Sequence, residues 1–493
     1  MTLAHNVATD KLINGSGVMF SCREAAALID SGDYEAAREA LGQQWRGAGK
    51  EPDLNGLPAE AKGEVLLQVG VLSGFLARAH VSGSQEPAKD LLSKSMRYFH
   101  EANNVAKTAE VRSELALCYW RTGAFDEARI LLEEAMNGLE SADLTARILI
   151  RLTLVEISQS RYLEAWDLLK KAQPLFDHCS ESTKGRWHGQ LALVFRRLST
   201  AQNRSDYADR AILEFTAAIF HYELAGHERH RARNLNNLAM LLYRLGRYGE
   251  AHQHLDRARQ IFGRLSDRGA VAEVDDTRCR ILLAEKRYQE AEKLIEGAIK
   301  TLQEVGQLAL LTDALTMKAT ILSRLEDKDL SLAVFQEAIR IGEEAGATTS
   351  AGLAALSLIE EHSPDLGEAE LCQAYSRADE MLAHTQDAEH LAELRNCARL
   401  VVEKLKLDPA QPLVDVMHAH EARYIETALL EEGGSVTRAA RRLGVTHQGL
   451  ASILNSRHKG LLAKRTPIIN RRRSIFKIKQ ERKKGRRFFS TVD

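Results

Sequence analysis

Close to the carboxyl end of the chain, side chains that can form hydrogen bonds recur at the spacing of one helix face. Hydroxyl, imidazole and amide groups of this kind can bond to the edges of nucleobases, and arginines pair with phosphate oxygens. The residues concerned are Thr446, His447, Gln448, Ser452 and Asn455, together with the preceding Arg438, Arg441 and Arg442. A helix pair buried inside a larger fold would not leave this face so polar, so the pattern predicts an exposed face that can bind a partner.

A preceding helix must support this polar segment. The apolar spacing predicts one amphipathic helix over 420–432, which ends where Gly433 and Gly434 break the pattern. Ser435 is then well placed to cap the next helix. The apolar side of the first helix is expected to hold Tyr424, Ile425, Ala428 and Leu429.

The segment 436–455 meets the requirements of a helix-turn-helix. Ala440 lies where the two helices would touch, and Gly444 can take the positive φ of the tight turn between them. Thr446 is placed to cap the second helix. The residues expected on the buried side of the pair are Ala439, Leu443, Val445, Leu450 and Ile453.

The positive charge of the chain is concentrated at the same end. Residues 438–493 hold 17 of the 67 Lys and Arg residues and two of the 68 acidic residues, a net charge of +15, and the remaining residues carry −16. Such a segment can neutralise phosphates and release counterions, although a solvated tail would have the same composition. Beside a helix-turn-helix, a basic arm on DNA is the better interpretation. Its candidate contacts are Arg457, Lys459, Arg471, Arg472 and Arg473.

The segment 425–445 resembles the Fis-type helix-turn-helix domain, which also ends many bacterial enhancer-binding activators. The resemblance rests on a Gly-Gly corner, an Ala-Ala pair and a Leu-Gly-Val turn. It implies a recognition helix in the major groove of double-stranded DNA and paired domains on a two-fold-related site, so a homodimer is expected. Residues 446–448 and Ser452 would face bases or nearby phosphates, and the three arginines the DNA backbone. The sequence departs from the pattern of this family at Gly449, which weakens the recognition helix by about 1 kcal/mol relative to alanine.

Upstream, an aromatic residue followed three or four positions later by alanine recurs six times. From Phe125 onward these aromatics lie 37, 45, 41 and 40 residues apart, a range typical of helix-pair solenoids. With only 8 prolines in 493 residues, the composition also predicts helix nearly throughout. The aromatics are Tyr34, Phe125, Tyr162, Tyr207, Tyr248 and Tyr288.

These units resemble tetratricopeptide repeats, and the best match begins at Asn236 and extends to Ala258. The resemblance implies that the first helix of each pair lines a concave surface for a peptide or protein partner. In the best unit this surface would expose Arg233, Asn236, Tyr243 and Arg244, which could hold a peptide carboxylate or backbone. A solvated helix face is the alternative interpretation. The unit at 315–340 lacks the aromatic, which leaves the number of repeats open, not the architecture.

The expected fold is all-α, with a tetratricopeptide-like solenoid, a small helix-turn-helix domain and a basic tail. Two of the eight prolines, Pro409 and Pro412, interrupt the helical pattern and indicate a linker. The expected boundaries are 1–19 for an N-terminal segment, 20–405 for the solenoid, 406–412 for the linker, 413–465 for the helix-turn-helix domain and 466–493 for the tail.

Composition and motifs argue against other classes of protein. No apolar run is long enough to span a bilayer, and residues 1–12 lack the pattern of a secretory signal. Six scattered cysteines indicate buried small residues in a reducing cytoplasm. The segment 47–51 lacks the Ser or Thr of a phosphate loop, and His227 and His230 are too close together for a zinc-protease signature. We therefore expect no enzyme, no catalytic residue, no metal site and no cofactor.

Two functions follow as hypotheses. The first is a bacterial, cytoplasmic, sequence-specific DNA-binding transcriptional regulator, whose solenoid senses a peptide, protein or small ligand or mediates self-association. The second is a non-enzymatic protein-interaction scaffold whose helix-turn-helix serves assembly. Binding to DNA that weakens steeply with salt would favour the first.

Overall fold

The computed structural model describes most of the chain. Its described residues are 2–47, 49–76, 84–202, 204–383, 385, 387–405 and 413–464. The regular structure in these ranges is helical throughout, as the composition predicts. The chain divides into two compact units, 1–401 and 402–493. The expected linker 406–412 and tail 466–493, with Arg471, Arg472 and Arg473, lie outside the described residues.

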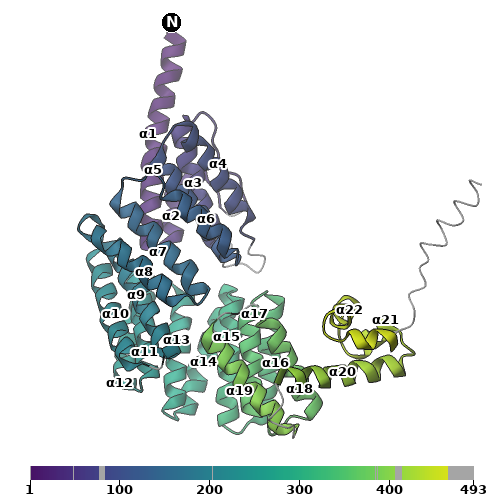
Figure 1. The fold of residues 1–493 in the computed structure, drawn as a ribbon. Coiled ribbons are helices and arrows are strands. Elements are labelled where there is room, and N and C mark those ends of the chain that lie inside the picture. The colour runs from purple at the N-terminus through teal and green to yellow at the C-terminus, as the bar shows by residue number, and fades with distance from the viewer. Residues whose placement is uncertain are drawn as a thin grey trace, which may run out of the picture. The chain divides into compact units, whose positions relative to one another are not determined.

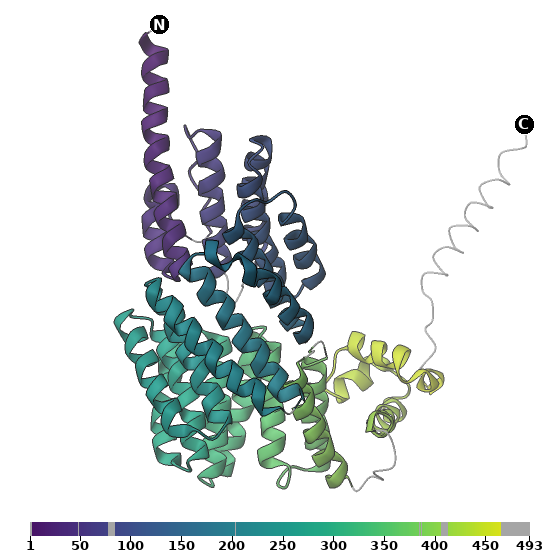
Figure 2. The ribbon, with the colours of Figure 1, turned by 60° about the vertical axis from the view of Figure 1, so that its left-hand side comes forward.

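The first unit consists of helices that pair with their neighbours along the chain (Figure 1). Pairs from α9 to α18 lie side by side, coloured teal to green (Figure 2), so the unit is a helix-pair solenoid. The helices are α1 (Thr2–Ser31), α2 (Tyr34–Leu41), α3 (Ala59–Leu76), α4 (Glu86–Glu101), α5 (Val105–Arg121), α6 (Phe125–Ala135), α7 (Ala142–Ser158), α8 (Tyr162–Ala172), α9 (Glu181–Gln202), α10 (Ser205–Leu224), α11 (Glu228–Arg244), α12 (Tyr248–Arg264), α13 (Arg268–Ala284), α14 (Tyr288–Val305), α15 (Leu308–Arg324), α16 (Lys328–Glu344), α17 (Thr348–His362), α18 (Glu368–Met381) and α19 (Ala388–Lys404).

The repeated aromatic and alanine positions explain why the helices pair. Five of the six aromatics are the first residue of the second helix in a pair, and Tyr207 lies in the first turn of α10. The alanines that follow them are fully buried, so the two backbones can approach closely. These alanines are Ala37, Ala128, Ala165, Ala211, Ala251 and Ala291, each with 0% of its surface exposed.

A left-handed residue closes the first helix of many pairs. Gly246 takes a φ of 73° after α11, where a glycine carries no steric penalty. Lys286 and Glu326 take the same conformation after α13 and α15, at a cost of about 1 kcal/mol each. The unit at 315–340 forms a helix pair although it lacks the aromatic residue. Asp327 caps α16 by accepting a hydrogen bond from the backbone N–H of Leu330.

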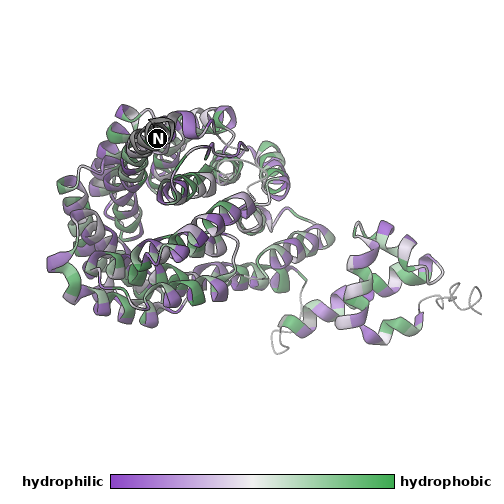
Figure 3. Cartoon of the chain, turned by 90° about the horizontal axis from the view of Figure 1, so that it is seen from above, coloured by the Kyte–Doolittle hydropathy of each residue, from purple (hydrophilic) through white to green (hydrophobic). Residues whose placement is uncertain are grey.

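The second unit is a small three-helix domain with a short C-terminal turn. Its elements are α20 (Leu413–Glu431), α21 (Val436–Arg442), α22 (His447–Ser456) and the 3-10 helix η4 (Lys459–Lys464). Figure 3 shows hydrophobic and hydrophilic residues alternating along these helices. The buried core is Ile425, Ala428, Leu429, Ala439, Ala440, Leu450 and Leu454.

Two apolar residues of this domain are more exposed than the sequence predicts. Val445 is 42% exposed and Tyr424 is 46% exposed, so the prediction that both lie on the buried side was wrong. Val445 lies in the turn between α21 and α22, where the helical periodicity no longer directs a side chain to the core. Leu454, which is 1% exposed, fills the core instead, and Ile453 packs at its edge.

No helix within the described ranges is long and apolar enough to cross a bilayer. Among the cysteines, five are buried, and Cys372 is half-buried. Burial raises the pKa of the Cys118 thiol to about 11, which disfavours the nucleophilic thiolate.

Candidate nucleic-acid interface

The two helices of the predicted helix-turn-helix begin at side-chain caps. Ser435 accepts a hydrogen bond from the backbone N–H of Arg438 at 3.4 Å, and Thr446 accepts one from the N–H of Gly449 at 3.0 Å. Between them Gly444 takes a φ of 69°, which a side chain would strain. Ala440, 1% exposed, lies in the contact between the helices. The two helix caps, the turn glycine and the small residue at the helix contact, all predicted from the sequence, are thus present in the structure.

The outer face of α22 is polar and open. The opposite face packs Leu450 and Leu454 into the core, so the helix cannot turn its polar side inward. The hydroxyl of Thr446 accepts the capping hydrogen bond and can still donate one. The amide of Asn455 donates to the carbonyl of Ala451 at 2.7 Å, which restrains its orientation. The exposed predicted contacts are Thr446, His447, Gln448, Ser452 and Asn455.

Two of the three arginines of α21 are already paired with acids at the end of α20. Arg438 donates to the carbonyl of Glu432 at 2.7 Å, with its Nε 3.3 Å from the carboxylate. Arg442 lies 2.6 Å from the carboxylate of Glu431. Arg441 is exposed and makes no ion pair within 413–464. Because both arginines are exposed, these ion pairs are weak, and a DNA phosphate can compete with the carboxylates.

The sequence did not indicate how the end of α22 is held. Arg457 and Lys459 are exposed as predicted, but His458 between them is only 8% exposed. Its Nε2 lies 2.6 Å from a carboxylate oxygen of Glu421 on α20. Leu461 and Leu462 of η4 pack against the same core. Two leucines shortly after the basic residues 457–459 are the sequence signal that could have indicated this contact.

The predicted ligand residues on α11 fall in different environments. Arg233 is exposed, Tyr243 is half-buried and Arg244 is exposed at the end of the helix. Asn236 is only 9% exposed, so the prediction that it lies on an open surface was wrong. The reason is that α11 packs against α10, α12 and α13 at once, which leaves only a narrow strip of it open.

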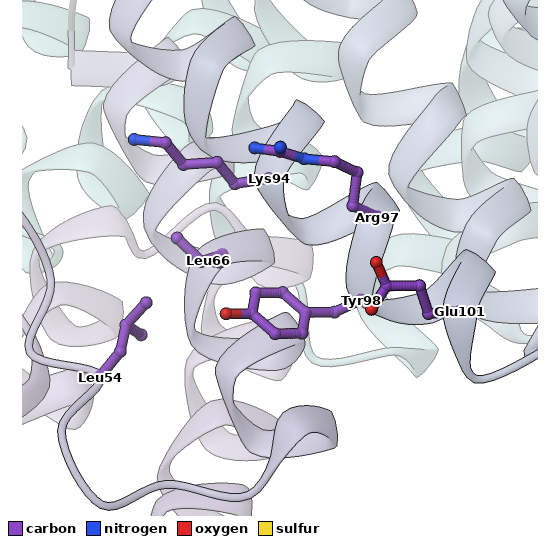
Figure 4. A pocket seen from close by; sticks show the side chains of 6 residues that line it. All are labelled: Leu54, Leu66, Lys94, Arg97, Tyr98 and Glu101. Carbon is purple, nitrogen blue, oxygen red and sulfur yellow. The ribbon is translucent and has the colours of Figure 1, made fainter.

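A separate pocket lies in the N-terminal helix pairs, far along the chain from α11 (Figure 4). It has a volume of about 370 Å³ and contains none of the residues predicted to bind a ligand. Lys94 pairs with Asp90 at 2.6 Å, and this hydrogen bond raises the pKa of Lys94. The lining residues are Leu54, Leu66, Lys94, Arg97, Tyr98 and Glu101.

Within the described ranges, no group of three or more histidine, cysteine or acidic side chains is placed to hold a metal ion. His230 instead lies 2.9 Å from the backbone carbonyl of Asp30, and His227 lies 3.9 Å from its carboxylate. Both histidines thus join the start of α11 to the end of α1.

Two known protein families match parts of the amino-acid sequence. Residues 419–452 match the family described as bacterial regulatory protein, Fis family. Residues 232–268 match the tetratricopeptide repeat. The chain thus combines a tetratricopeptide-repeat solenoid with a C-terminal Fis-type helix-turn-helix, and both are non-catalytic kinds of domain. No curated protein matches the sequence of the chain.

Solved structures show a similar helical fold at low sequence identity. One is a signal transduction ATPase with numerous domains and a tetratricopeptide repeat sensor, from Pyrococcus horikoshii, with 13% identity and a TM-score of 0.48. The match covers 74% of this chain and 54% of that protein, so the chain spans about half of its length. A Rap protein complexed with competence and sporulation factor matches with 15% identity, 70% and 100% coverage and a TM-score of 0.47. Yeast Tom70 matches with 17% identity, 81% and 84% coverage and a TM-score of 0.43.

Proposed function

We propose that the chain is a bacterial, cytoplasmic, sequence-specific DNA-binding transcriptional regulator whose solenoid binds a peptide or protein partner. The observation that carries this proposal is the face of α22. Five side chains able to form hydrogen bonds are exposed there, while Leu450 and Leu454 anchor the helix from behind. A helix supported in this way can enter the major groove without losing its core contacts.

The residues of the interface divide into two roles. Gln448 and His447, at the start of α22, would contact base edges, because the first turn of a recognition helix reaches deepest into the groove. Arg438, Arg441 and Arg442 on α21, with Arg457 and Lys459 beyond α22, would contact phosphates. The basic residues 471–473 would add sequence-independent contacts. Two copies of the domain, and so a homodimer, would bind a two-fold-related site.

Binding of the full chain to duplex DNA at increasing salt concentrations tests this proposal. We expect affinity to fall linearly with salt on logarithmic axes, and Arg441→Gln to reduce that slope by about 1 on every sequence. Gln448→Ala should instead change the preference among sequences in a pool of random duplexes. Arg264→Gln, which removes an arginine 64% exposed in the solenoid, is the matched control and should leave binding unchanged.

The same experiment separates the regulator from a protein-interaction scaffold. A chain that binds no duplex at low salt would contradict the regulator and leave the scaffold. DNA affinity that is insensitive to Arg441→Gln and Gln448→Ala would show that α22 is not the recognition helix. We propose no enzymatic activity for either function.

A further inference from the structure

The outer face of α10 carries a row of exposed apolar side chains. Leu213, Phe220 and Leu224 are 69%, 56% and 59% exposed, and the half-buried Ala217 lies between them. These four residues form the α10 stripe. They are spaced by four, three and four positions, so they follow one face of the helix over about 16 Å.

Other repeats of the solenoid have polar residues at the same places. Counted from the small buried residue at the helix contact, Ala211 in α10, the positions two, nine and thirteen residues further on are exposed in α10, α12, α14 and α16 alike. They hold Gln253, Gln260 and Arg264 in α12, Lys293, Lys300 and Glu304 in α14, and Ala333, Arg340 and Glu344 in α16. The repeat therefore folds without large apolar residues there, and the three on α10 indicate a contact made outside the solenoid.

The residues around the α10 stripe narrow the kind of partner. Glu214 lies on one flank of the stripe and the exposed Glu223 on the other. Acids on both flanks disfavour the anionic surface of a membrane, which attracts helices flanked by lysine and arginine. The alternating spacing of three and four is that of a coiled-coil seam, so the surface that fits the stripe is another helix.

The shape of the α10 stripe is complementary to a second copy of itself. In an antiparallel pair about a two-fold axis, Leu213 of each copy faces Leu224 of the other, and Ala217 faces Phe220. Each large ring is thus set against a small side chain, which fills the seam without a clash. A parallel pair would instead set ring against ring and leave a gap between the two alanines.

The charged flanks favour the same arrangement. The antiparallel pair places Glu214 of each copy beside His221 of the other, whereas a parallel pair would bring Asp209 beside Glu214 and repel. Both flanking side chains are held in place within the chain. Nδ1 of His188 lies 2.6 Å from the carboxylate of Glu214, and Nδ1 of His221 lies 2.6 Å from that of Glu181.

We propose that α10 is a dimer interface of the solenoid, in which the α10 stripe packs antiparallel against the same stripe of a second copy. The inference rests on the proposed homodimer for its choice of partner, and it assigns the contact to the solenoid. An interface between two identical patches closes after two copies, so it produces a dimer and not a filament. The apolar side chains form its desolvated centre, and the flanking polar residues form its rim.

The mass of the full chain in solution, measured without DNA by light scattering after size-exclusion chromatography, tests the interface. We expect a dimer for the wild type. Leu213→Gln with Phe220→Gln and Leu224→Arg introduces the residues that α12 has at these positions, and it should raise the dimer dissociation constant by about a hundredfold. The helical circular dichroism should stay unchanged, because α12 folds with the same residues. Leu245→Gln with Leu330→Gln removes two exposed leucines elsewhere in the solenoid and should remain dimeric.

A second pair of variants tests the antiparallel contact directly. Leu213→Lys alone and Leu224→Glu alone should each weaken the dimer. Combined in one chain, they set each lysine against a glutamate of the other copy, so the dimer should return at low salt and weaken as salt is added. Within one helix these two positions are about 16 Å apart, so they cannot pair with each other.

A wild type that is monomeric at every concentration would overturn the proposal. So would a dimer that persists in the triple variant, which would leave the DNA-binding domain as the interface, and so would a combined variant weaker than both single ones. Because the measurement contains no DNA, a failure of DNA binding would leave its outcome intact. Conversely, a monomeric wild type that still binds duplex DNA would separate the loss of this interface from the DNA-binding proposal.

Discussion

The backbone carbonyl of Asp30 lies 2.9 Å from Nε2 of His230, 200 residues further along the chain. Arg186 of α9 donates to the same carbonyl at 3.1 Å and pairs with the carboxylate of Asp30 at 2.5 Å. The end of α1 is thereby held against α9 and α11, so the N-terminal helix pairs are fixed to the middle of the solenoid. Burial, with the charge of Arg186, lowers the pKa of His230 to about 3.

This histidine should make the solenoid sensitive to acid. Its pKa is about 3 in the folded chain and about 6.5 when unfolded. Its contribution to stability is therefore complete above pH 6.5 and is lost progressively as the pH falls towards 3. Between pH 7.5 and 5.5 we expect a loss of about 1 kcal/mol from this residue, measured as a lower melting temperature. His230→Gln should show a smaller drop, whereas a variant at the exposed His100, His100→Gln, should behave as the wild type. An unchanged drop in His230→Gln would contradict this assignment.

Two helix-interior glycines should respond in opposite directions to the same substitution. A Cβ on Gly342 of α16 would lie 2.8 Å from the Cβ of Ala351 and 3.0 Å from a methyl group of Thr312. Gly342→Ala should therefore destabilise the solenoid by about 1–3 kcal/mol. A Cβ on the exposed Gly297 of α14 meets nothing within 4 Å, so Gly297→Ala should stabilise it by about 1 kcal/mol. Thermal unfolding checks both, and shifts of the same sign would contradict the packing of α16.

The core of the helix-turn-helix can be tested at Ala440. This residue is 1% exposed between α21 and α22, so Ala440→Leu should separate the helices at a cost of about 1–3 kcal/mol. DNA affinity should fall on all sequences alike, because the recognition helix loses its support. Val445→Leu adds one methylene to the turn at a residue 42% exposed and should leave binding unchanged. Loss of binding in Val445→Leu instead would indicate that Val445 is buried, as the sequence predicted.

The acids at the end of α20 should weaken DNA binding. Glu431 and Glu432 hold Arg442 and Arg438 in exposed ion pairs, and their charge also repels phosphates. Glu431→Gln with Glu432→Gln should therefore increase DNA affinity about threefold to tenfold at low salt, with a smaller gain at high salt. Glu60→Gln with Glu127→Gln removes the same charge from the solenoid and serves as the control. A gain in both variants would indicate only a general effect of net charge.

Much of the architecture could be predicted from local pattern. The aromatic and alanine positions of each unit act within one pair of helices, so their spacing alone indicates where helices begin and which residues are buried. The caps at Ser435 and Thr446 and the turn at Gly444 are likewise signals within a few residues. Caps and turns can be predicted from the sequence, because the residues that form them lie only a few positions apart.

Contacts between side chains that lie far apart in the sequence cannot be predicted in this way. The pairing of Arg244 with Glu389 joins residues 145 positions apart, and nothing near either one indicates the other. The burial of Asn236 depends on three neighbouring helices, and the exposure of Val445 on how one turn projects its side chain. The sequence by itself determined the helix pairs and the helix-turn-helix, because their stabilising contacts are local. Only the tertiary structure decided which charged residues meet and which surface stays open, because those contacts depend on how the pairs stack.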